Sequence, residues 1–314
     1  HTLATKGGFS SEFKPIEFPK PVYSVAVVAK TRADEDKLGN AISRTLEEDC
    51  SLTFEKNAET RDNVLSGMGD MHIDIVLSKM KERYGVELDT KTPQVPYRET
   101  IRKVSEAQGK HKKQSGGHGQ YGHVKMRFAP SNDLETPYVF TQEVVGGSVP
   151  KNYFPAVEKG IQESVLAGPL AGYPVVGVQA TLYDGSYHPV DSSEMAFKIA
   201  SVQAFKDGIM QANPVLLEPI ALVKVCVEDQ YTGDIMGDLN KRRGRVLGMN
   251  PDNQGGTVIE AEVPYMEMFG YVTDLRSMTG GSGDYSYEFC RYEQAPHDIQ
   301  DKEVAARKAE AENA

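Results

Sequence analysis

The spacing of apolar residues predicts a series of strands and helices near the amino end of this chain, and the same series is predicted again near the carboxyl end. Residues 22–29 form an apolar run of strand length, and Leu38, Ile42 and Leu46 then recur as on one face of a helix. The next segments have strand, strand, helix and strand character in turn: 51–56, 60–69, 70–85 and 86–90. This order predicts a domain of the split β-α-β-β-α-β kind.

The helix expected at 70–85 has recognisable ends and one apolar face. Asp70 is a residue type that caps helix starts, and Gly85 is the type that ends helices. The apolar positions share one face: Ile73, Leu77, Met80 and Tyr84. We interpret His72, in the same helix, as a packed residue in preference to a metal ligand.

Near the carboxyl end the same order returns with a dissimilar sequence. The elements expected there are strand, helix, strand, strand, helix and strand: 218–229, 232–244, 245–250, 256–264, 268–281 and 284–292. The middle region has strands at 124–130 and 138–147 and a helix at 153–168. Asp191, with Glu194 three residues later, predicts the start of another long helix. The chain is therefore expected to be α+β with several domains.

Composition narrows the classes of protein. The chain has 314 residues, 39% hydrophobic and 25% charged, which is usual for a folded protein of two or three domains. Its apolar runs are too short to cross a bilayer. Three widely spaced cysteines without a C-x-x-C pair argue against a disulfide framework and a zinc site. We therefore expect a reducing, cytoplasmic location.

The distribution of charge is more informative than the net charge of -10. Between residues 98 and 127 only Glu99 and Glu106 oppose a set of eight cations: Arg98, Arg102, Lys103, Lys110, Lys112, Lys113, Lys125 and Arg127. This basic segment surrounds the glycine-rich stretch QSGGHGQYGHVK at 114–125. Phosphate affinity comes from Lys and Arg, so the segment favours contact with a phosphate backbone.

Other interpretations of the glycine-rich stretch have weaker support. No G-x-x-x-x-G-K-[ST] occurs in the chain, and a strand follows the glycines, so neither type of nucleotide-binding loop is indicated. A metal site of His118, His123 and His188, with Asp191 as a further ligand, lacks ligand spacing. A hydrolase using Ser186 or Ser192 lacks a G-x-S-x-G elbow. A plain glycine hairpin stays open. We predict no catalytic residue and no metal ligand.

A second basic group, NKRRGR at 240–245, lies where a helix is expected to end. Cations there interact favourably with the helix dipole, so helix capping is one interpretation. Four cations in five residues exceed that need, and RNA contact is the other.

Several motifs occur together along the chain: KKQSGGHGQYGHV, GPLAGYPVVGV, GSYHPVDSSEMAF, PVLLEPI, GDLNKRRGRVLGM and AEVPYMEMFGYVTDLRSMTGGSGDYSYEF. In this order and spacing they resemble the carboxy-terminal half of the bacterial elongation factor G family, the translocation GTPases of the ribosome. VLSGMGDMHIDIVLSKMKERYGVEL resembles that family's third domain. The resemblance extends from Pro19 to Tyr292, and the family has arginine where this chain has His118.

The resemblance implies two ferredoxin-like split β-α-β domains flanking an elongated α/β domain, which has the domain-2-like fold of a small-subunit ribosomal protein. The implied parts are the end of a preceding β-barrel domain, domain three, tip domain four with the packed tail 293–308, and domain five: 1–18, 19–94, 95–216 and 217–292. The GTPase domain is expected to be missing, and with it GTP and Mg²⁺, so the chain itself would have no cofactor and no catalysis.

The resemblance also implies a site and partners. The fourth domain's tip would contact tRNA and mRNA on the ribosome through two loops: Ser115, Gly116, Gly117, His118, Gly119, Gln120, Tyr121 and Gly122, with Ser186, Tyr187 and His188. Large-subunit RNA would be contacted by Lys241, Arg242, Arg243 and Arg245. The expected protein is a cytoplasmic monomer that binds both ribosomal subunits and no membrane. A stand-alone RNA-binding module, a ribosomal protection protein and a divergent paralogue remain alternatives.

Overall fold

The computed structural model describes residues 14, 16, 18–57, 59–114, 119–252 and 255–313. Four of the expected tip residues, Ser115, Gly116, Gly117 and His118, lie outside the described residues. The chain divides into two units, one with the residues up to Gln94 and Leu222–Glu288, the other with Val95–Ala221 and the residues from Phe289 onward. Each unit is described separately below.

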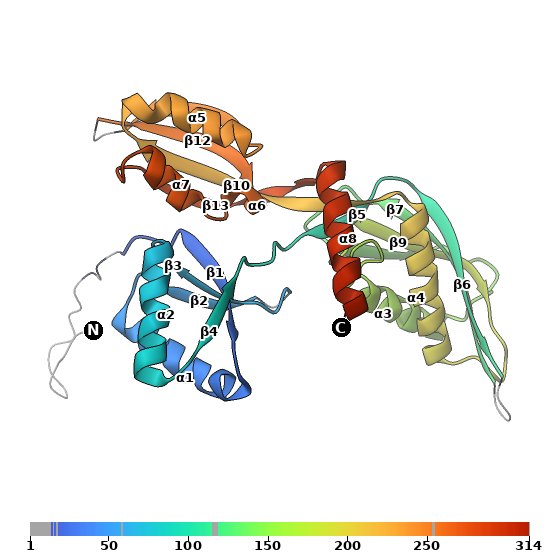
Figure 1. The fold of residues 1–314 in the computed structure, drawn as a ribbon. Coiled ribbons are helices and arrows are strands. Elements are labelled where there is room, and N and C mark those ends of the chain that lie inside the picture. Colours follow the sequence, from blue (N-terminus) through green and yellow to red (C-terminus); the bar gives the residue numbers. More distant parts are fainter. Residues whose placement is uncertain are drawn as a thin grey trace, which may run out of the picture. The chain divides into compact units, whose positions relative to one another are not determined.

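The first unit contains the predicted amino-terminal split β-α-β-β-α-β order (Figure 1). Its elements are β1 (Tyr23–Ala29), α1 (Arg32–Glu48), β2 (Thr53–Lys56), β3 (Asn63–Gly67), α2 (Asp70–Tyr84) and β4 (Leu88–Lys91). The strands form one antiparallel sheet in the order β2-β3-β1-β4. The sheet and both helices bury a shared core: Val25, Val27, Leu38, Ala41, Ile42, Leu52, Leu65, Ile73, Val76, Met80 and Val86.

The expected helix stripes are confirmed, but the start of α2 differs. Leu38 and Ile73 are buried, and Gly85 ends α2 in the left-handed conformation at φ 61°. Gly69 is the N-cap residue of α2, and no side chain caps the helix. Asp70 is instead the first helical residue. Its carboxylate accepts a hydrogen bond from the Met71 N–H and interacts favourably with the helix dipole.

The same unit contains most of the second split β-α-β-β-α-β domain, the one predicted near the carboxyl end. The elements are β10 (Pro214–Val227), α5 (Thr232–Lys241), β11 (Arg245–Pro251), β12 (Thr257–Pro264), α6 (Tyr265–Met268), α7 (Tyr271–Met278) and β13 (Asp284–Gln294), with a 3₁₀ turn at Asp229–Tyr231. Their sheet has the order β11-β12-β10-β13, which repeats the order of the first copy. The helix expected at 268–281 is the shorter α7, because Phe269 and Gly270 have extended and left-handed backbone and separate it from α6.

The second unit contains a different sheet. Its elements are β5 (Arg98–Ile101), β6 (Ser105–Lys113), β7 (Gln120–Pro130), β8 (Tyr138–Gln142), a 3₁₀ turn (Lys151–Tyr153), α3 (Phe154–Ser164), β9 (Val178–Ser186) and α4 (Glu194–Gln211). The sheet order is β6-β7-β9-β8, with β8 and β9 parallel. Strand β5 pairs with the first residues of β10. The α+β class is therefore confirmed.

Two glycines let α4 lie directly on the sheet, beside α3 (Figure 1). A Cβ atom on Gly109 would lie 1.7 Å from the Ala200 carbonyl oxygen, and one on Gly122 would lie 2.5 Å from the Ala196 carbonyl. The core beneath contains large side chains such as Phe128, which packs edge-on against Phe205 at 5.8 Å. The close packing of α4 on β6 and β7 therefore positions the start of α4, which the loop at 187–192 precedes.

The last helix, α8 (His297–Asn313), belongs to the second unit. The Tyr173 hydroxyl donates to Glu303 and accepts from Arg307 Nε at 3.0 Å, while the Arg307 guanidinium lies 4.4 Å from the centre of the same ring. The Leu216 N–H donates to Gln300 at 2.9 Å. In the part of the chain that the structure describes, no helix combines the length and apolar character needed to cross a bilayer.

Candidate functional site

The described tip residues converge at one end of the second unit. Gly119 precedes β7, which begins with Gln120, Tyr121 and Gly122, and Ser186 ends β9. These strands are antiparallel neighbours in which His123 pairs with Ser186, so the start of one lies beside the end of the other. We call residues 119–122 the first tip loop and residues 187–192 the second tip loop. The structure thus brings together the described residues of the two segments that the sequence analysis grouped.

The start of α4 differs from the expectation. Ser193 is the N-cap residue, and its hydroxyl accepts from the Ala196 N–H at 3.2 Å. Asp191 therefore does not cap this helix. Its Oδ1 accepts from the Gly119 N–H at 3.0 Å, and its carbonyl accepts from the Tyr121 N–H at 2.8 Å. Asp191 thus joins the second tip loop to the first.

Ser192 makes further bonds between the two loops. Its hydroxyl accepts from the His188 N–H at 2.8 Å and donates to the Tyr121 carbonyl at 3.0 Å. Sequence reasoning did not assign Asp191 or Ser192 to the site. A signal was available, because Asp191, Ser192 and Ser193 are three consecutive residues of cap-forming type, and one helix start needs only one.

The His188 imidazole is held by contacts within its own loop. The Asp191 and Val190 N–H groups donate to its Nδ1 at 3.1 and 3.3 Å. The Asp191 Oδ2 atom lies 3.3 Å from the same Nδ1. The side chain is 51% exposed. His188 is therefore an exposed polar side chain on a hydrogen-bonded loop.

Behind the tip, hydrogen bonds join three strands. Ser186 Oγ lies 2.7 Å from the Tyr121 hydroxyl and 2.8 Å from His123 Nδ1. His123 Nε2 lies 3.3 Å from Gln108 Oε1 on β6. Partial burial lowers the pKa of His123, and the positive charges of Lys110 and Lys125 lower it further. A neutral imidazole can accept from Ser186 and donate to Gln108, which satisfies both contacts.

A hollow of about 220 Å³ lies beside these loops. Its lining includes two lysines, two glutamines, a tyrosine ring and a histidine ring: Lys112, Lys113, Gln114, Gly119, Gln120, Tyr121, His188 and Asp191. Ammonium groups and side-chain donors are the groups that contact phosphate and sugar oxygens, and aromatic rings stack on bases. Across the described ranges, no cluster of three or more His, Cys, Asp or Glu residues is arranged to hold a metal ion.

The second basic group, residues 241–245, divides into partly buried and exposed residues. Arg242 is 15% exposed, and its guanidinium donates to Asp238 at 2.7 Å, to the Glu267 carbonyl at 2.8 Å and to Asp274. It also lies 5.0 Å from the centre of the Tyr271 ring. These bonds join α5 to α6 and α7, so Arg242 has a structural role.

The other three cations of this group are more accessible. Arg243 is in the left-handed conformation at φ 60° and pairs with Glu267 at 3.1 Å. Arg245, 69% exposed, pairs with Glu262 at 2.6 Å, and Lys241 is exposed. Lys241 and Arg245 are thus the more exposed cations of this group. Lys241 and Arg245 are therefore the members best placed to contact phosphate.

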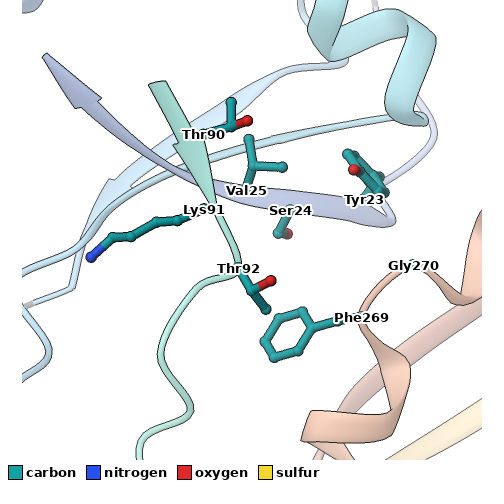
Figure 2. A pocket seen from close by; sticks show the side chains of 8 residues that line it. All are labelled: Tyr23, Ser24, Val25, Thr90, Lys91, Thr92, Phe269 and Gly270. Carbon is teal, nitrogen blue, oxygen red and sulfur yellow. The ribbon is translucent and has the colours of Figure 1, made fainter. Parts of the chain in front are cut away.

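The first unit contains a larger cavity of about 440 Å³ (Figure 2). Its lining comes from three segments: Tyr23, Ser24 and Val25; Thr90, Lys91 and Thr92; and Phe269 and Gly270. The Ser24 hydroxyl is bonded to the Ser66 hydroxyl at 2.7 Å. No sequence motif indicated this cavity, because its three segments are far apart in the chain.

Comparisons with known proteins match most of the described residues. The family models for elongation factor G domain III, domain IV and the elongation factor G carboxyl terminus match residues 18–92, 93–213 and 215–303. The chain is also similar to a Thermus thermophilus protein of known crystal structure, with 43% sequence identity and a TM-score of 0.82. That match covers 95% of this chain and 46% of the other, so this chain spans about half the length of that relative. The chain belongs to the elongation factor G family of translation factors and contains its domains III, IV and carboxy-terminal domain.

Proposed function

We propose that this chain is the ribosome-binding part of a translation elongation factor that promotes GTP-dependent translocation of tRNA and mRNA. In this proposal the two tip loops contact tRNA and mRNA on the small subunit, and Lys241 and Arg245 contact RNA of the large subunit. The chain acts as a cytoplasmic monomer without catalysis of its own. GTP and Mg²⁺ are bound by another domain of the full-length family protein.

The convergence of the two tip loops carries this proposal. Their exposed polar residues, Gln120 and His188, lie with Lys112 and Lys113 around one hollow at one end of the second unit. Recognition of folded RNA uses shape, backbone and 2′-hydroxyl contacts, for which short polar loops with glycine are suited. The chain as a whole has a net charge of -10, so its average charge does not favour binding to phosphate. The lysines beside this hollow provide positive charge where the proposal places the RNA.

Co-sedimentation with ribosomes tests the proposal. The chain and its Gln120→Ala, His188→Ala and Lys112→Ala/Lys113→Ala variants are compared at about 50 mM and about 200 mM salt. The matched controls are His297→Ala, at the start of α8, and Lys159→Ala, an exposed lysine of α3. We expect the tip variants to bind several-fold more weakly than the controls, and the double lysine variant to have a shallower salt dependence.

The alternative functions predict other results. A stand-alone RNA-binding module would bind free RNA as tightly as it binds ribosomes. Equal binding by the tip variants and the controls would mean that the tip loops do not contact the ribosome, and the assignment of the site would be wrong.

A further inference from the structure

The side-chain hydroxyl of Ser192 bridges the two tip loops by accepting from one and donating to the other. It accepts from the His188 N–H at 2.8 Å and donates to the Tyr121 carbonyl at 3.0 Å. The Ser192 N–H also donates to the His188 carbonyl at 3.1 Å, and Ser192 forms a parallel bridge with Tyr121. The backbone of each tip loop is therefore held by the same residue.

Ser192 is itself anchored to the core of the second unit. Its carbonyl accepts from the Tyr153 hydroxyl at 3.3 Å, and the Tyr153 ring stacks on Phe197 at 4.5 Å. Phe197 is fully buried in the first turn of α4. The adjacent Asp191 adds the bonds to Gly119 and to the Tyr121 N–H. The two loops are thus connected to a rigid element as well as to each other.

We propose that Ser192, assisted by Asp191, is a positioning residue that holds the two tip loops in their RNA-binding arrangement before RNA is met. The inference rests on the proposed function, because it concerns the same site. Ordering loops during association costs affinity, so a surface that is ordered in advance binds more tightly. A hydroxyl is needed because the same oxygen accepts one hydrogen bond and donates another, and alanine would remove both bonds.

The chain offers a matched control in the neighbouring serine. Ser193 caps α4 through the Ala196 N–H and makes no described bond to the first tip loop. Ser193→Ala therefore lowers helix stability while the bridge stays intact. Ser192→Ala is expected to weaken ribosome binding about five- to tenfold, as loss of a bridging hydrogen bond does. Ser193→Ala is expected to bind like the unchanged chain, and Ser192→Thr, which keeps the hydroxyl, to recover most of the binding.

Two further measurements separate positioning from simple stability. In the His188→Ala background, Ser192→Ala is expected to have a smaller effect, because the part of its effect that comes from placing the His188 side chain is already lost. Hydrogen exchange of the Tyr121 amide is expected to accelerate in Ser192→Ala and not in Ser193→Ala, without any ribosome present. Asp191→Ala provides an independent variant should Ser192→Ala fail to fold, with the same expected direction in binding and exchange.

The outcomes are distinguishable. If His188→Ala and Gln120→Ala weaken binding while Ser192→Ala and Asp191→Ala do not, the positioning role is overturned and the proposed function stands. If none of the four variants changes binding, both are overturned. Equal losses in Ser192→Ala and Ser193→Ala, with unchanged Tyr121 exchange, would reduce Ser192 to a contributor to helix stability and overturn the inference.

Discussion

The Ser186 hydroxyl lies 2.8 Å from Nδ1 of His123, which ties the last residue of β9 to the strand that carries the first tip loop. The second tip loop begins at the next residue, Tyr187, so this bond lies directly beside the start of that loop. The Ser186 hydroxyl can donate to Nδ1 of a neutral imidazole, whereas a protonated ring has no acceptor nitrogen. The stability of this end of the second unit is therefore linked to pH.

Acid should destabilise the second unit through His123. Its pKa in the folded chain is lowered, whereas in the unfolded chain it is near 6.5. Between these two values the unfolded chain binds more protons, so the free energy of unfolding decreases as the pH falls from about 7. A His123→Gln variant lacks this contribution. Urea denaturation at about pH 7.5 and about pH 5.5 should show a smaller loss of stability in the variant than in the unchanged chain. Parallel losses in the two proteins would refute the assignment.

Glu99 stabilises the loop that follows α3. The residue is fully buried, and its carboxylate accepts the N–H groups of Leu170, Ala171 and Tyr173 at 3.0, 2.8 and 3.0 Å. Burial raises the pKa of this carboxyl, and the backbone donors oppose that shift. Glu99→Gln places an amide N–H₂ opposite backbone donors, and we expect a loss of about 1–3 kcal/mol in the free energy of unfolding. Glu158→Gln, on the exposed face of α3, should change it by less than about 0.5 kcal/mol.

Within the second basic group, substitution of Arg242 should change stability, and substitution of Lys241 should change ribosome binding. Arg242→Lys loses the fork of donors to Asp238, Asp274 and the Glu267 carbonyl, and we expect a cost of about 2–4 kcal/mol in the free energy of unfolding. Lys241→Ala should leave stability within about 0.5 kcal/mol and weaken ribosome binding with a reduced salt dependence. Thermal unfolding and co-sedimentation of both variants provide the comparison. Unchanged binding in Lys241→Ala and Arg245→Ala would remove this surface from the ribosome contacts.

Two glycine substitutions should have opposite effects. Gly109→Ala would place a methyl group against the Ala200 carbonyl, so α4 must move from the sheet, and we expect a loss of at least about 3 kcal/mol. At Gly237, inside α5, a methyl group would have no described atom within 4 Å outside its own helix. Gly237→Ala should therefore stabilise the chain by up to about 1 kcal/mol. Denaturant midpoints measure both, and a stabilised Gly109→Ala variant would contradict the packing of α4 on the sheet.

The periods of apolar residues were sufficient to predict both split domains, because each helix and strand buries one face. Leu38 and Ile42, for example, recur at helical spacing and are both buried. Helix starts were less predictable. Asp191, Ser192 and Ser193 all suit a cap, and only the geometry of the chain before α4 selects Ser193.

The bonds within the candidate site could not be predicted from the sequence. Gly119 and Asp191 are 72 positions apart, and they meet because β7 and β9 are neighbours. Their register also shifts at Lys125 and Met126, which no local sequence signal indicated. The resemblance to a family identified the loops, whereas the residues that join the loops required the structure.

The central claim, that the tip loops contact RNA on the ribosome, is tested most directly by site-directed photocrosslinking. A photoreactive residue replaces Tyr187, which is 46% exposed in the second tip loop, and in a control chain it replaces Leu166, 69% exposed beyond α3. With ribosomes carrying tRNA and mRNA, we predict RNA crosslinks from position 187, on tRNA, mRNA or small-subunit RNA, and few from position 166. Crosslinks of equal yield from both positions, or none from position 187 while the chain is bound, would contradict the account.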